Sequence, residues 1–458
     1  MTHQPLLAHR DLDAALAYRR GVPISVRQFL ADALALAAAL PDTDHIINAC
    51  ADRYRFAVAL AACLISGRVS LLPPSHIART LEQLRDFADD ALVLADTEHR
   101  DLRQPVLAFP ELPPAAFRPA VEVTEIPTIP AEQLAAWVFT SGSTGAPQPH
   151  RKHWGPLRRN VANEARALGF APEQPVTLVG TVPPQHMYGF ESTVLLAWLS
   201  GGNFETARPF YPADIATTLA ACPARNMLVT TPFHLEKILD AGAELTRAGS
   251  LLCATAPLSQ ALALRAEAAS GAPLFEIYGS TETGQLATRR TSRELAWTLF
   301  PDVRLEARDG QTWAQGGHVE VAVPLGDIIE QIDEHRFELK GRQTDLINIA
   351  GKRTSLGWLN RQLLSIPGVR DGCFHLPEAS DPAPSVVRLA AFVVAPGQSA
   401  KQLLAALRER IDPVFLPRPL ILLDALPRNP VGKLLKAECE ALFRQHARDT
   451  DQRHGRFE

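Results

Sequence analysis

The sequence predicts a mixed α/β protein built from several units, and three observations support this fold class. Short apolar runs alternate with helical patterns from Ser25 to Leu92, which is the rhythm of strands and helices on a parallel sheet. A similar alternation resumes from Thr177 to Ala269. The chain has 458 residues, so a prior of one domain per ~150 residues suggests about three structural units with a sizeable core.

The expected elements follow in chain order. In the first block the predicted helices are Ser25–Leu40, Asp52–Ile65 and Thr80–Ala88, and the predicted strands are His45–Ala49 and Val69–Leu72. The proline-rich stretch from Gln104 to Ala131 cannot continue a helix and indicates an extended connector. In the second block the alternation runs through Thr177–Val182, Glu191–Leu199, Asn226–Thr231, Phe233–Leu239, Leu251–Ala254 and Leu258–Ala269.

The pattern changes in the last third of the chain. Short alternating strands separated by glycine and charged turns predict a small β element from about Val303 to Phe337. A compact α/β tail follows Gly341, and we place the domain boundary near Lys340–Asp345. Residues 445–458 are charged and show no periodicity, so they are predicted to be a frayed tail.

Composition and charge exclude several classes of protein. The 46 Lys and Arg residues nearly balance the 50 Asp and Glu residues, which is not the surface of a nucleic-acid binder. The longest apolar stretches fall well short of the roughly 18 residues needed to span a membrane. The N-terminus lacks the pattern of a signal peptide, and the six cysteines are scattered singly. We therefore expect a cytoplasmic protein with buried thiols and neither structural zinc nor disulfides.

The most informative segment is a predicted strand that opens into a loop of glycines and hydroxyls. It reads Phe139-Thr-Ser-Gly-Ser-Thr-Gly-Ala-Pro147. Its hydroxyls and backbone N–H groups can close around a phosphate, because glycine lets the chain bend tightly. It is not the P-loop of kinases and ATPases, since Pro147 or His150 stands where the second glycine belongs. By itself, the segment fits a phosphate cradle and a surface turn equally well.

Three later segments carry groups that a nucleotide site needs. Tyr278-Gly-Ser-Thr-Glu282 follows an apolar strand and places a ring for a purine and a carboxylate for Mg²⁺ on one predicted turn. Gly326-Asp327 offers an acid for ribose hydroxyls and is followed by a turn rich in cations. Lys433 follows a glycine turn that could deliver it into a cleft. Taken singly, these segments are also compatible with a strand end or a solvated turn.

The four segments in this order resemble the superfamily of adenylate-forming enzymes, which includes acyl-CoA synthetases, peptide-synthetase adenylation domains and luciferases. The resemblance covers roughly Ser25 to Leu442. It implies the adenylate-forming (ANL) fold, with a large N-terminal domain, residues 1–340, of two α/β subdomains and a small β-barrel. A small mobile C-terminal α/β domain, residues 341–458, would carry the catalytic lysine. The implied cofactors are ATP and Mg²⁺.

The resemblance also implies roles for individual residues. Lys433 would bridge the attacking carboxylate and the α phosphate, while Thr281 and Glu282 would contact the α phosphate and Mg²⁺. The nucleotide would be held by Tyr278 on adenine, by Asp327 and Arg342 on the ribose, and by Thr140, Ser141, Gly142, Ser143, Thr144 and Gly145 on the β and γ phosphates. The acyl pocket would be lined by His186, Gly189, Thr230, Ala254 and Ala256. For His186, an interior histidine that only satisfies a hydrogen bond is the alternative.

The chain departs from the family's pattern at two places. The family usually has a lysine after the proline of the phosphate loop, but Gln148 stands there, and whether Lys152 replaces that lysine stays open. Thr344 stands where the interdomain hinge usually has Asp or Lys. Both departures concern the dynamics of loops more than the binding of nucleotide.

The implied function is ATP-dependent activation of a carboxylic acid to acyl-AMP, followed by transfer to a thiol. The chain looks like the stand-alone ligases that load 3-hydroxybenzoate or similar aryl acids onto an acyl carrier protein in pigment pathways such as that of xanthomonadin. An acyl-CoA or aryl-CoA synthetase that uses free CoA is the alternative among enzymes. A catalytically silent sensor of nucleotide or acyl-AMP is the alternative outside enzymes, against which the presence of Lys433, Glu282 and Asp327 argues.

Overall fold

The chain divides into two compact units. A computed structural model describes residues 2–98, 102, 106–110, 123–141, 147–342, 346–349, 352–377, 388–428, 434 and 436–454. The first unit holds Met1–Glu306 and Ala314–Val323, and the second holds Ala307–Trp313 and Pro324–Glu458. The predicted domain boundary, between residues 340 and 341, falls within the second unit. That the two domains hinge there stays a prediction.

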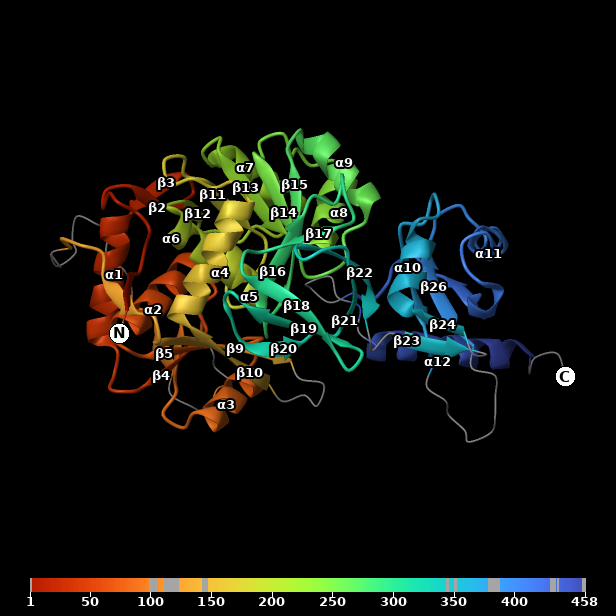
Figure 1. Cartoon of the computed structure of the whole chain (residues 1–458), viewed down its shortest axis with the longest axis horizontal. Helices are drawn as coiled ribbons and strands as arrows, with labels where there is room; N and C mark the ends of the chain where they lie inside the picture. The colour runs from red at the N-terminus through yellow and green to blue at the C-terminus, as the bar shows by residue number, and fades with distance from the viewer. Residues whose placement is uncertain are drawn as a thin grey trace. The chain divides into compact units, whose positions relative to one another are not determined.

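The first sheet of the first unit arises from the strand and helix alternation near the N-terminus (Figure 1). Its strands run in the order β10-β9-β5-β4-β6-β7, and all neighbours are parallel except β9 and β10. Helix α3 packs Leu81 and Leu84 against Ile47, Leu71 and Phe139 of the sheet. The bounds are β4 (His45–Asn48), β5 (Val69–Leu72), α3 (Ala78–Phe87), β6 (Leu92–Ala95), β7 (Val106–Ala108), β9 (Leu134–Ser141) and β10 (Pro147–His153).

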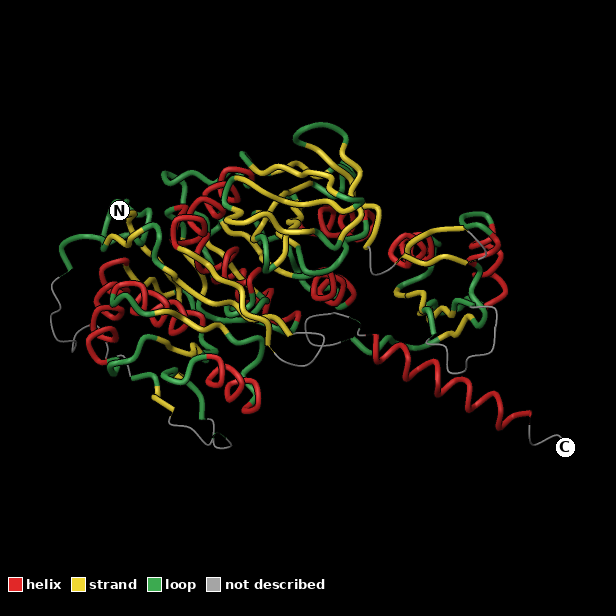
Figure 2. The backbone as a smooth tube through the Cα atoms, turned by 60° about the horizontal axis from the view of Figure 1, so that its bottom comes forward, coloured by secondary structure: helices red, strands yellow, loops and turns green. Residues whose placement is uncertain are grey.

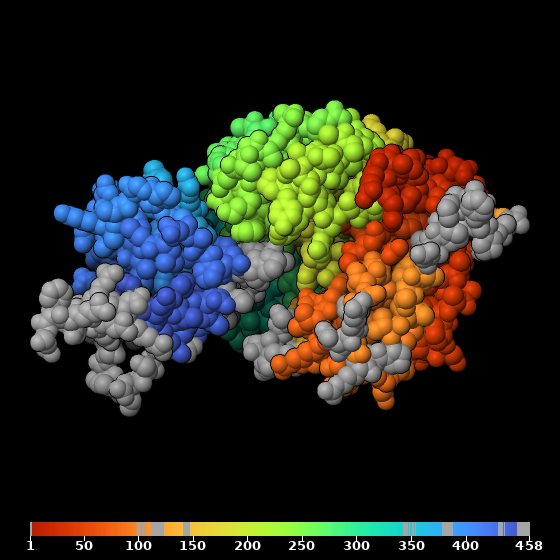
Figure 3. Space-filling model, turned by 180° about the vertical axis from the view of Figure 1, so that it is seen from behind, coloured from red at the N-terminus to blue at the C-terminus, as the bar shows by residue number. Residues whose placement is uncertain are grey.

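The second sheet carries most of the predicted site. Within the first unit its strands run in the order β17-β16-β15-β14-β13-β11-β12-β2-β3, with a parallel centre from β15 to β2. The bounds are β2 (Ala15–Arg19), β3 (Val22–Ser25), β11 (Thr177–Gly180), β12 (Asn203–Glu205), β13 (Asn226–Thr230), β14 (Ser250–Cys253), β15 (Leu274–Ser280), β16 (Gly284–Arg289) and β17 (Trp297–Leu299). Because β2 pairs with β12, the N-terminal segment joins this sheet, and Figure 3 shows the red and yellow-green surfaces in contact.

Helices pack on both blocks of the first unit. One core joins strands β11, β13, β14 and β15 to apolar residues of α7 (Pro212–Ala221), α8 (Pro232–Asp240) and α9 (Gln260–Ser270). The π-helix η2 (Phe190–Leu195) and α6 (Leu196–Ser200) pack against α4 (Trp154–Ala167). Several helices begin after a residue whose side-chain oxygen accepts a hydrogen bond from the backbone N–H three residues later. These residues are Ser25 for α1 (Val26–Ala39), Asp52 for α2 (Arg53–Ile65), Thr231 for α8 and Ser259 for α9.

The second unit contains the predicted α/β tail. A core of β25, β26, α10 and α11 includes Leu359, Phe374, Ala391 and Leu403. The bounds are β21 (Asp327–Gln331), β22 (Arg336–Arg342), β23 (Leu346–Ile349), β24 (Lys352–Ser355), α10 (Leu356–Leu364), β25 (Asp371–His375), β26 (Ala390–Val394), α11 (Ala400–Arg408), β27 (Leu420–Leu422) and α12 (Lys436–His454). A further sheet of β18 (Val303–Arg308), β19 (Gln311–Gly316) and β20 (Val319–Pro324) contributes residues to both units.

Two local expectations were wrong. The tail from residue 445 is helical as far as His454, and Figure 2 shows α12 as one continuous helix. Strand β15 runs on to Ser280, so Tyr278 lies in the strand rather than on the turn. Pairing with β16 as far as Ser280 extends this strand beyond its local pattern. The predicted extended connector from Gln104 to Ala131 holds two short strands, β7 and β8 (Thr128–Pro130), and β8 pairs with β1 (His3–Pro5).

Two further expectations concern membranes and cysteines. Among the described helices, none is long and apolar enough to cross a bilayer. All six cysteines are buried thiols, as predicted, and the Sγ atoms of Cys373 and Cys439 lie 3.9 Å apart.

Candidate active site

The predicted site residues of the first unit gather at one edge of the second sheet. Strands β11, β13, β14 and β15 are parallel, so their carboxyl ends meet at the same edge. Thr181, Thr230, Ala254 and Tyr278 lie at or directly after these ends. Open α/β sheets bind ligands at this edge, because the loops that leave parallel strands there surround a crevice.

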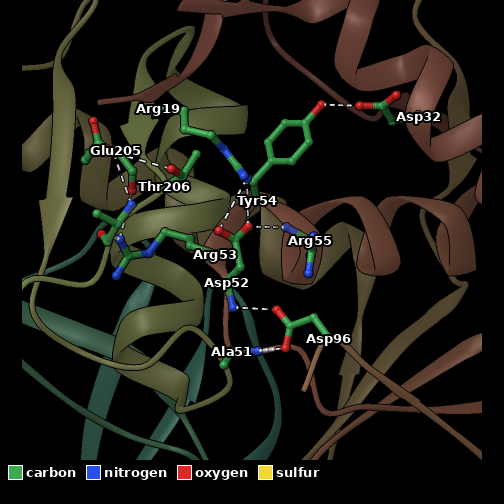
Figure 4. A network of polar contacts seen from close by, with 11 residues as sticks. Arg19, Asp32, Ala51, Asp52, Arg53, Tyr54, Arg55, Asp96, Glu205 and Thr206 are labelled. Atoms are coloured by element: carbon green, nitrogen blue, oxygen red, sulfur yellow. Dashed lines mark hydrogen bonds and ion pairs between the residues drawn. The ribbon is translucent and has the colours of Figure 1, made fainter. Parts of the chain in front are cut away.

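A buried arginine holds the ends of β11 and β12 in place. Arg53 is fully buried at the start of α2, and its guanidinium donates to the carbonyls of Gly180, Val182, Glu205 and Ala207 at 2.8 to 3.0 Å. Figure 4 shows Arg53 beside Glu205. Burial lowers the pKa of Arg53 to about 10, so it stays charged at neutral pH. The segment that leads to His186 therefore leaves β11 from a fixed position.

The turn between β15 and β16 carries Thr281 and Glu282. Hydroxyls close it from within: Ser280 N–H donates to Thr283 Oγ1 at 3.2 Å, and Thr283 N–H donates to Ser280 Oγ at 3.3 Å. Gly284 has a φ of +72°, which favours glycine. An added Cβ there would lie 2.6 Å from Asn160 Nδ2. The turn is therefore fixed both by its own hydroxyls and by the helix beneath it.

Glu282 is an exposed carboxylate held in its ionised form. Burial alone would raise the pKa of Glu282, but hydrogen bonds from Ser280 and its own backbone, with the charges of His150 and Lys152, lower it. Mg²⁺ prefers one or two carboxylates together with phosphate oxygens and water. Among the described residues no group of three His, Cys, Asp or Glu side chains could hold a metal alone. Glu282 thus fits a Mg²⁺ ion that arrives with the phosphates of ATP.

His150 links the strand before the phosphate loop to Glu282. Its Nε2 lies 3.1 Å from Thr140 Oγ1 and 3.8 Å from Glu282 Oε1. Burial lowers the pKa of His150. The structure therefore brings together Thr140 and Glu282, two predicted nucleotide-binding residues. They lie 282 − 140 = 142 residues apart in the chain, and β9 and β15 belong to different sheets.

A cavity with several charged and polar lining residues lies beside this turn. It encloses about 310 Å³ and is lined by residues that include Lys152, Asn160, Glu191, Gly284 and His318. Lys152 Nζ lies 3.4 Å from the carbonyl oxygen of Glu282. Burial lowers the pKa of Lys152 and raises that of Glu191. The charge of each residue acts in the opposite direction, because it favours the ionised form of the other. A buried lysine and a buried glutamate thus line the same cavity.

The predicted acyl-pocket residues lie on neighbouring segments. Thr230 is fully buried, and its Oγ1 lies 3.0 Å from Thr181 Oγ1, which also contacts His234 Nδ1 at 3.2 Å. His186 directly precedes the short helix α5 (Met187–Gly189), and burial followed by the charge of Arg208 lowers its pKa.

The backbone geometry explains two other predicted pocket residues. A Cβ on Gly189 would lie 2.0 Å from the carbonyl oxygen of Pro183, so this glycine packs against the chain itself. Ala254 is buried and Ala256 is half-buried on the loop after β14. Between them, Thr255 has a φ of +79°, which turns the chain sharply at the edge of the sheet.

The remaining predicted residues lie in the second unit, elsewhere in the first unit, or outside the described residues. Asp327 and Arg342 are direct cross-strand partners on β21 and β22, so the two predicted ribose contacts are neighbours. Tyr278 packs against Trp297 with a centroid distance of 5.6 Å. Outside the described residues lie Gly142, Ser143, Thr144, Gly145, Thr344 and Lys433, and the backbone alone is described for Ser141. Their roles stay predictions.

Sequence reasoning missed the polar residues of the cavity. Asn160, which lines the cavity, and Glu164 lie on the buried face of α4 beside Leu157 and Val161. Glu191, which also lines the cavity, lies on η2. A signal was present, because polar residues four apart on an apolar helix face interrupt the expected stripe. Arg53 left no such signal, since it reads as an ordinary charge in the first turn of a helix.

Comparisons with known proteins establish the family. Residues 8–339 match the family described as AMP-binding enzyme. The chain belongs to the AMP-binding enzyme family. A 4-coumarate–CoA ligase of Rhodobacter capsulatus is 31% identical over 307 residues, which are 66% of this chain and 75% of that protein. An anthranilate–CoA ligase of Pseudomonas aeruginosa is 25% identical over 94% of both chains. An L-proline–[L-prolyl-carrier protein] ligase of Streptomyces coelicolor is 24% identical over 69% of this chain and 67% of that protein.

Solved structures share the fold. ATP-bound MatB from Rhodopseudomonas palustris has a TM-score of 0.81 at 19% identity, over 95% of this chain and 96% of that chain. The o-succinylbenzoate CoA synthetase of Bacillus subtilis, in complex with its acyl-adenylate, has a TM-score of 0.79 at 19% identity, over 96% and 99%. The ANL fold predicted from the motifs is confirmed.

Membership in the AMP-binding enzyme family sets the general chemistry. The chain is an AMP-forming acid–thiol ligase, which activates a carboxylic acid to acyl-AMP. Ligases of this family use ATP with Mg²⁺. The identity of the acid and of the thiol is a separate question.

Proposed function

We propose that this ligase activates an aryl carboxylic acid and transfers the acyl group to a phosphopantetheine thiol. The observation that carries the proposal is the convergence of Thr140, His150 and Glu282 beside the carboxyl ends of the sheet that bears Tyr278 and Thr230. This arrangement supports a nucleotide on one side and an acid on the other. The 4-coumarate and anthranilate ligases among the relatives support an aryl acid.

The proposed first step joins the acid to the nucleotide. A carboxylate oxygen attacks the α phosphorus of ATP, the bond to the bridging oxygen breaks, and pyrophosphate leaves with its electron pair. Charge grows on the phosphoryl oxygens, so positioned cations and hydrogen-bond donors dominate the rate. Glu282 would hold Mg²⁺, which neutralises phosphate charge when bound, and Lys433 would bridge the two reactants.

The proposed second step releases AMP. A thiol sulfur attacks the carbonyl carbon of the acyl-AMP, the thiol loses its proton to solvent, and AMP leaves as the carbon–oxygen bond to phosphate breaks. Free CoA and a carrier protein present the same phosphopantetheine thiol. The CoA ligases among the relatives favour CoA, while the carrier-protein ligase keeps an acyl carrier protein as the second candidate.

Acid-dependent release of pyrophosphate tests the first step. We expect release with at least one of 3-hydroxybenzoate, 4-coumarate and anthranilate, and weaker release with medium-chain fatty acids. Preference for fatty acids would overturn the aryl assignment. Nucleotide binding without release for any acid would instead support a silent sensor.

The acceptor is tested with the best acid of that panel. The mass of a phosphopantetheinylated carrier protein and the formation of acyl-CoA are measured in parallel reactions. An acylated carrier without acyl-CoA assigns the carrier, the reverse assigns CoA, and failure of both with continued pyrophosphate release would reject the transfer step.

A further inference from the structure

Lys152 is a lysine in the interior of the first unit. It lies on β10, where it is only 7% exposed, whereas its neighbour Arg151 is exposed. Both residues line the cavity beside the 280–284 turn, but only the side chain of Lys152 is buried. A buried ammonium is costly unless a specific partner compensates it, and such a partner marks a defined role.

The partners of Lys152 lie on two other elements. Its Nζ approaches the carbonyl oxygen of Glu282 at 3.4 Å, and the nearby negative charges are those of Glu191, Glu320 and Glu282. Glu191 is 1% exposed on η2 and accepts a hydrogen bond from Asn160 Nδ2. Lys152 therefore ties β10 to the turn that carries Glu282. The buried Glu191 lies near enough to favour the charged form of its ammonium.

The same group of residues supports the turn at its other end. An added Cβ at Gly284 would meet Asn160 Nδ2 at 2.6 Å and Glu191 Oε1 at 3.2 Å. The backbone of the turn is thus in contact with Asn160 and Glu191 at residue 284 and with Lys152 at residue 282. Any change in this group would move the carboxylate of Glu282, because the turn has little freedom of its own.

We propose that Lys152 is a positioning residue, which sets the place of Glu282 through the backbone of the 280–284 turn. This inference rests on the proposed role of Glu282 in binding Mg²⁺ with ATP. The proposal also bears on the family lysine that Gln148 replaces. The ammonium of Lys152 contacts the backbone carbonyl of Glu282, so Lys152 would affect Mg²⁺ binding by holding that backbone.

Binding of MgATP to the full-length protein tests this inference without turnover. Lys152→Met should weaken the binding of MgATP, measured by calorimetry in the absence of acid, by about tenfold or more, the size expected for loss of a hydrogen bond from a charged group. The Mg²⁺ concentration for half-maximal pyrophosphate release should rise in parallel, while KM for the acid changes less than twofold. Arg151→Met, which removes an exposed charge from the same strand and the same cavity, should change neither quantity.

A second variant distinguishes a loss of MgATP binding from misfolding of the Lys152→Met protein. Lys152→Met removes the charge that favours the ionised form of Glu191. The double variant Lys152→Met with Glu191→Gln also replaces that buried carboxyl by an amide. We expect the double variant to unfold at a urea concentration closer to that of the wild type and to show the same loss of MgATP affinity. Unchanged MgATP affinity in the folded double variant, or equal losses of affinity for MgATP and acid, would overturn the inference.

The failure of the proposed function would look different. A wild-type protein that binds MgATP but releases no pyrophosphate with any acid rejects the ligase assignment, yet the comparison of MgATP binding between variants still decides the role of Lys152.

Discussion

Gly189 shows how a single residue can be required by the backbone alone. Because a Cβ there would lie 2.0 Å from the carbonyl oxygen of Pro183, the segment from Pro183 to Gly189 closes tightly only with glycine. Gly189→Ala should destabilise the protein by about 1 to 3 kcal/mol, the usual cost of overpacking. KM for the acid should also rise, because His186 lies on this segment. Urea unfolding and acid titration measure both effects, and an unchanged urea midpoint would contradict the steric argument.

Lys433 is the residue on which the proposed first step depends most. Lys433→Ala should slow adenylation by ~100-fold or more, the order seen when one preorganised charge-stabilising donor is removed. Formation of the thioester from synthetic acyl-AMP should survive, because that step does not need the lysine. Pyrophosphate exchange measures the first step, and near-normal exchange would remove Lys433 from the assigned role.

At the scale of elements, the ends of β11 and β12 depend on Arg53. Arg53→Met leaves four carbonyl oxygens without their donor, at Gly180, Val182, Glu205 and Ala207. Loss of a buried charged partner of this kind costs about 3 kcal/mol or more. Urea unfolding should show this loss. Arg55→Met, two residues along the same helix and only partly buried, is the matched control and should cost less than about 1 kcal/mol.

Elements also show where local patterns fall short. The helical pattern of α2 and α9 is visible in the sequence, because each starts at a capping residue and continues with good helix formers. Strand β10 contains two prolines, two histidines, an arginine and a lysine among its seven residues, so it has no strand pattern. It forms because it pairs along its length with β9, and that pairing is decided by the neighbour rather than by its own residues.

At the scale of the whole molecule, a buried acid makes stability depend on pH. Glu164 is fully buried. The amide of the nearby Gln285 donates from Nε2 to Ser192 Oγ at 2.8 Å, so it does not fully compensate the buried carboxyl of Glu164. Burial raises the pKa of Glu164 from 4.5 to about 7. The folded state therefore binds the proton more tightly than the unfolded state does. The stability from this group is present below pH 4.5 and is lost as pH rises through 7.

The expected result is a difference between two pH profiles. Between pH 5 and pH 8.5 the free energy of unfolding of the wild type should fall by on the order of 2 kcal/mol relative to that of Glu164→Gln. Urea unfolding at several pH values measures it. Glu173→Gln, at an exposed position, should follow the wild type. Parallel profiles for the wild type and Glu164→Gln would show that burial does not shift this carboxyl.

The amino-acid sequence by itself determined the α/β architecture and the family chemistry. The alternation of strands and helices is a pattern of residues close together in the chain. The motifs around Phe139, Tyr278 and Lys433 are likewise short segments that can be recognised without knowing the fold. Only the tertiary structure decided that Lys152, Glu191 and Glu282 share one cavity wall. The reason is physical: whether a charge is buried, and what compensates it, depends on contacts between residues far apart in the chain.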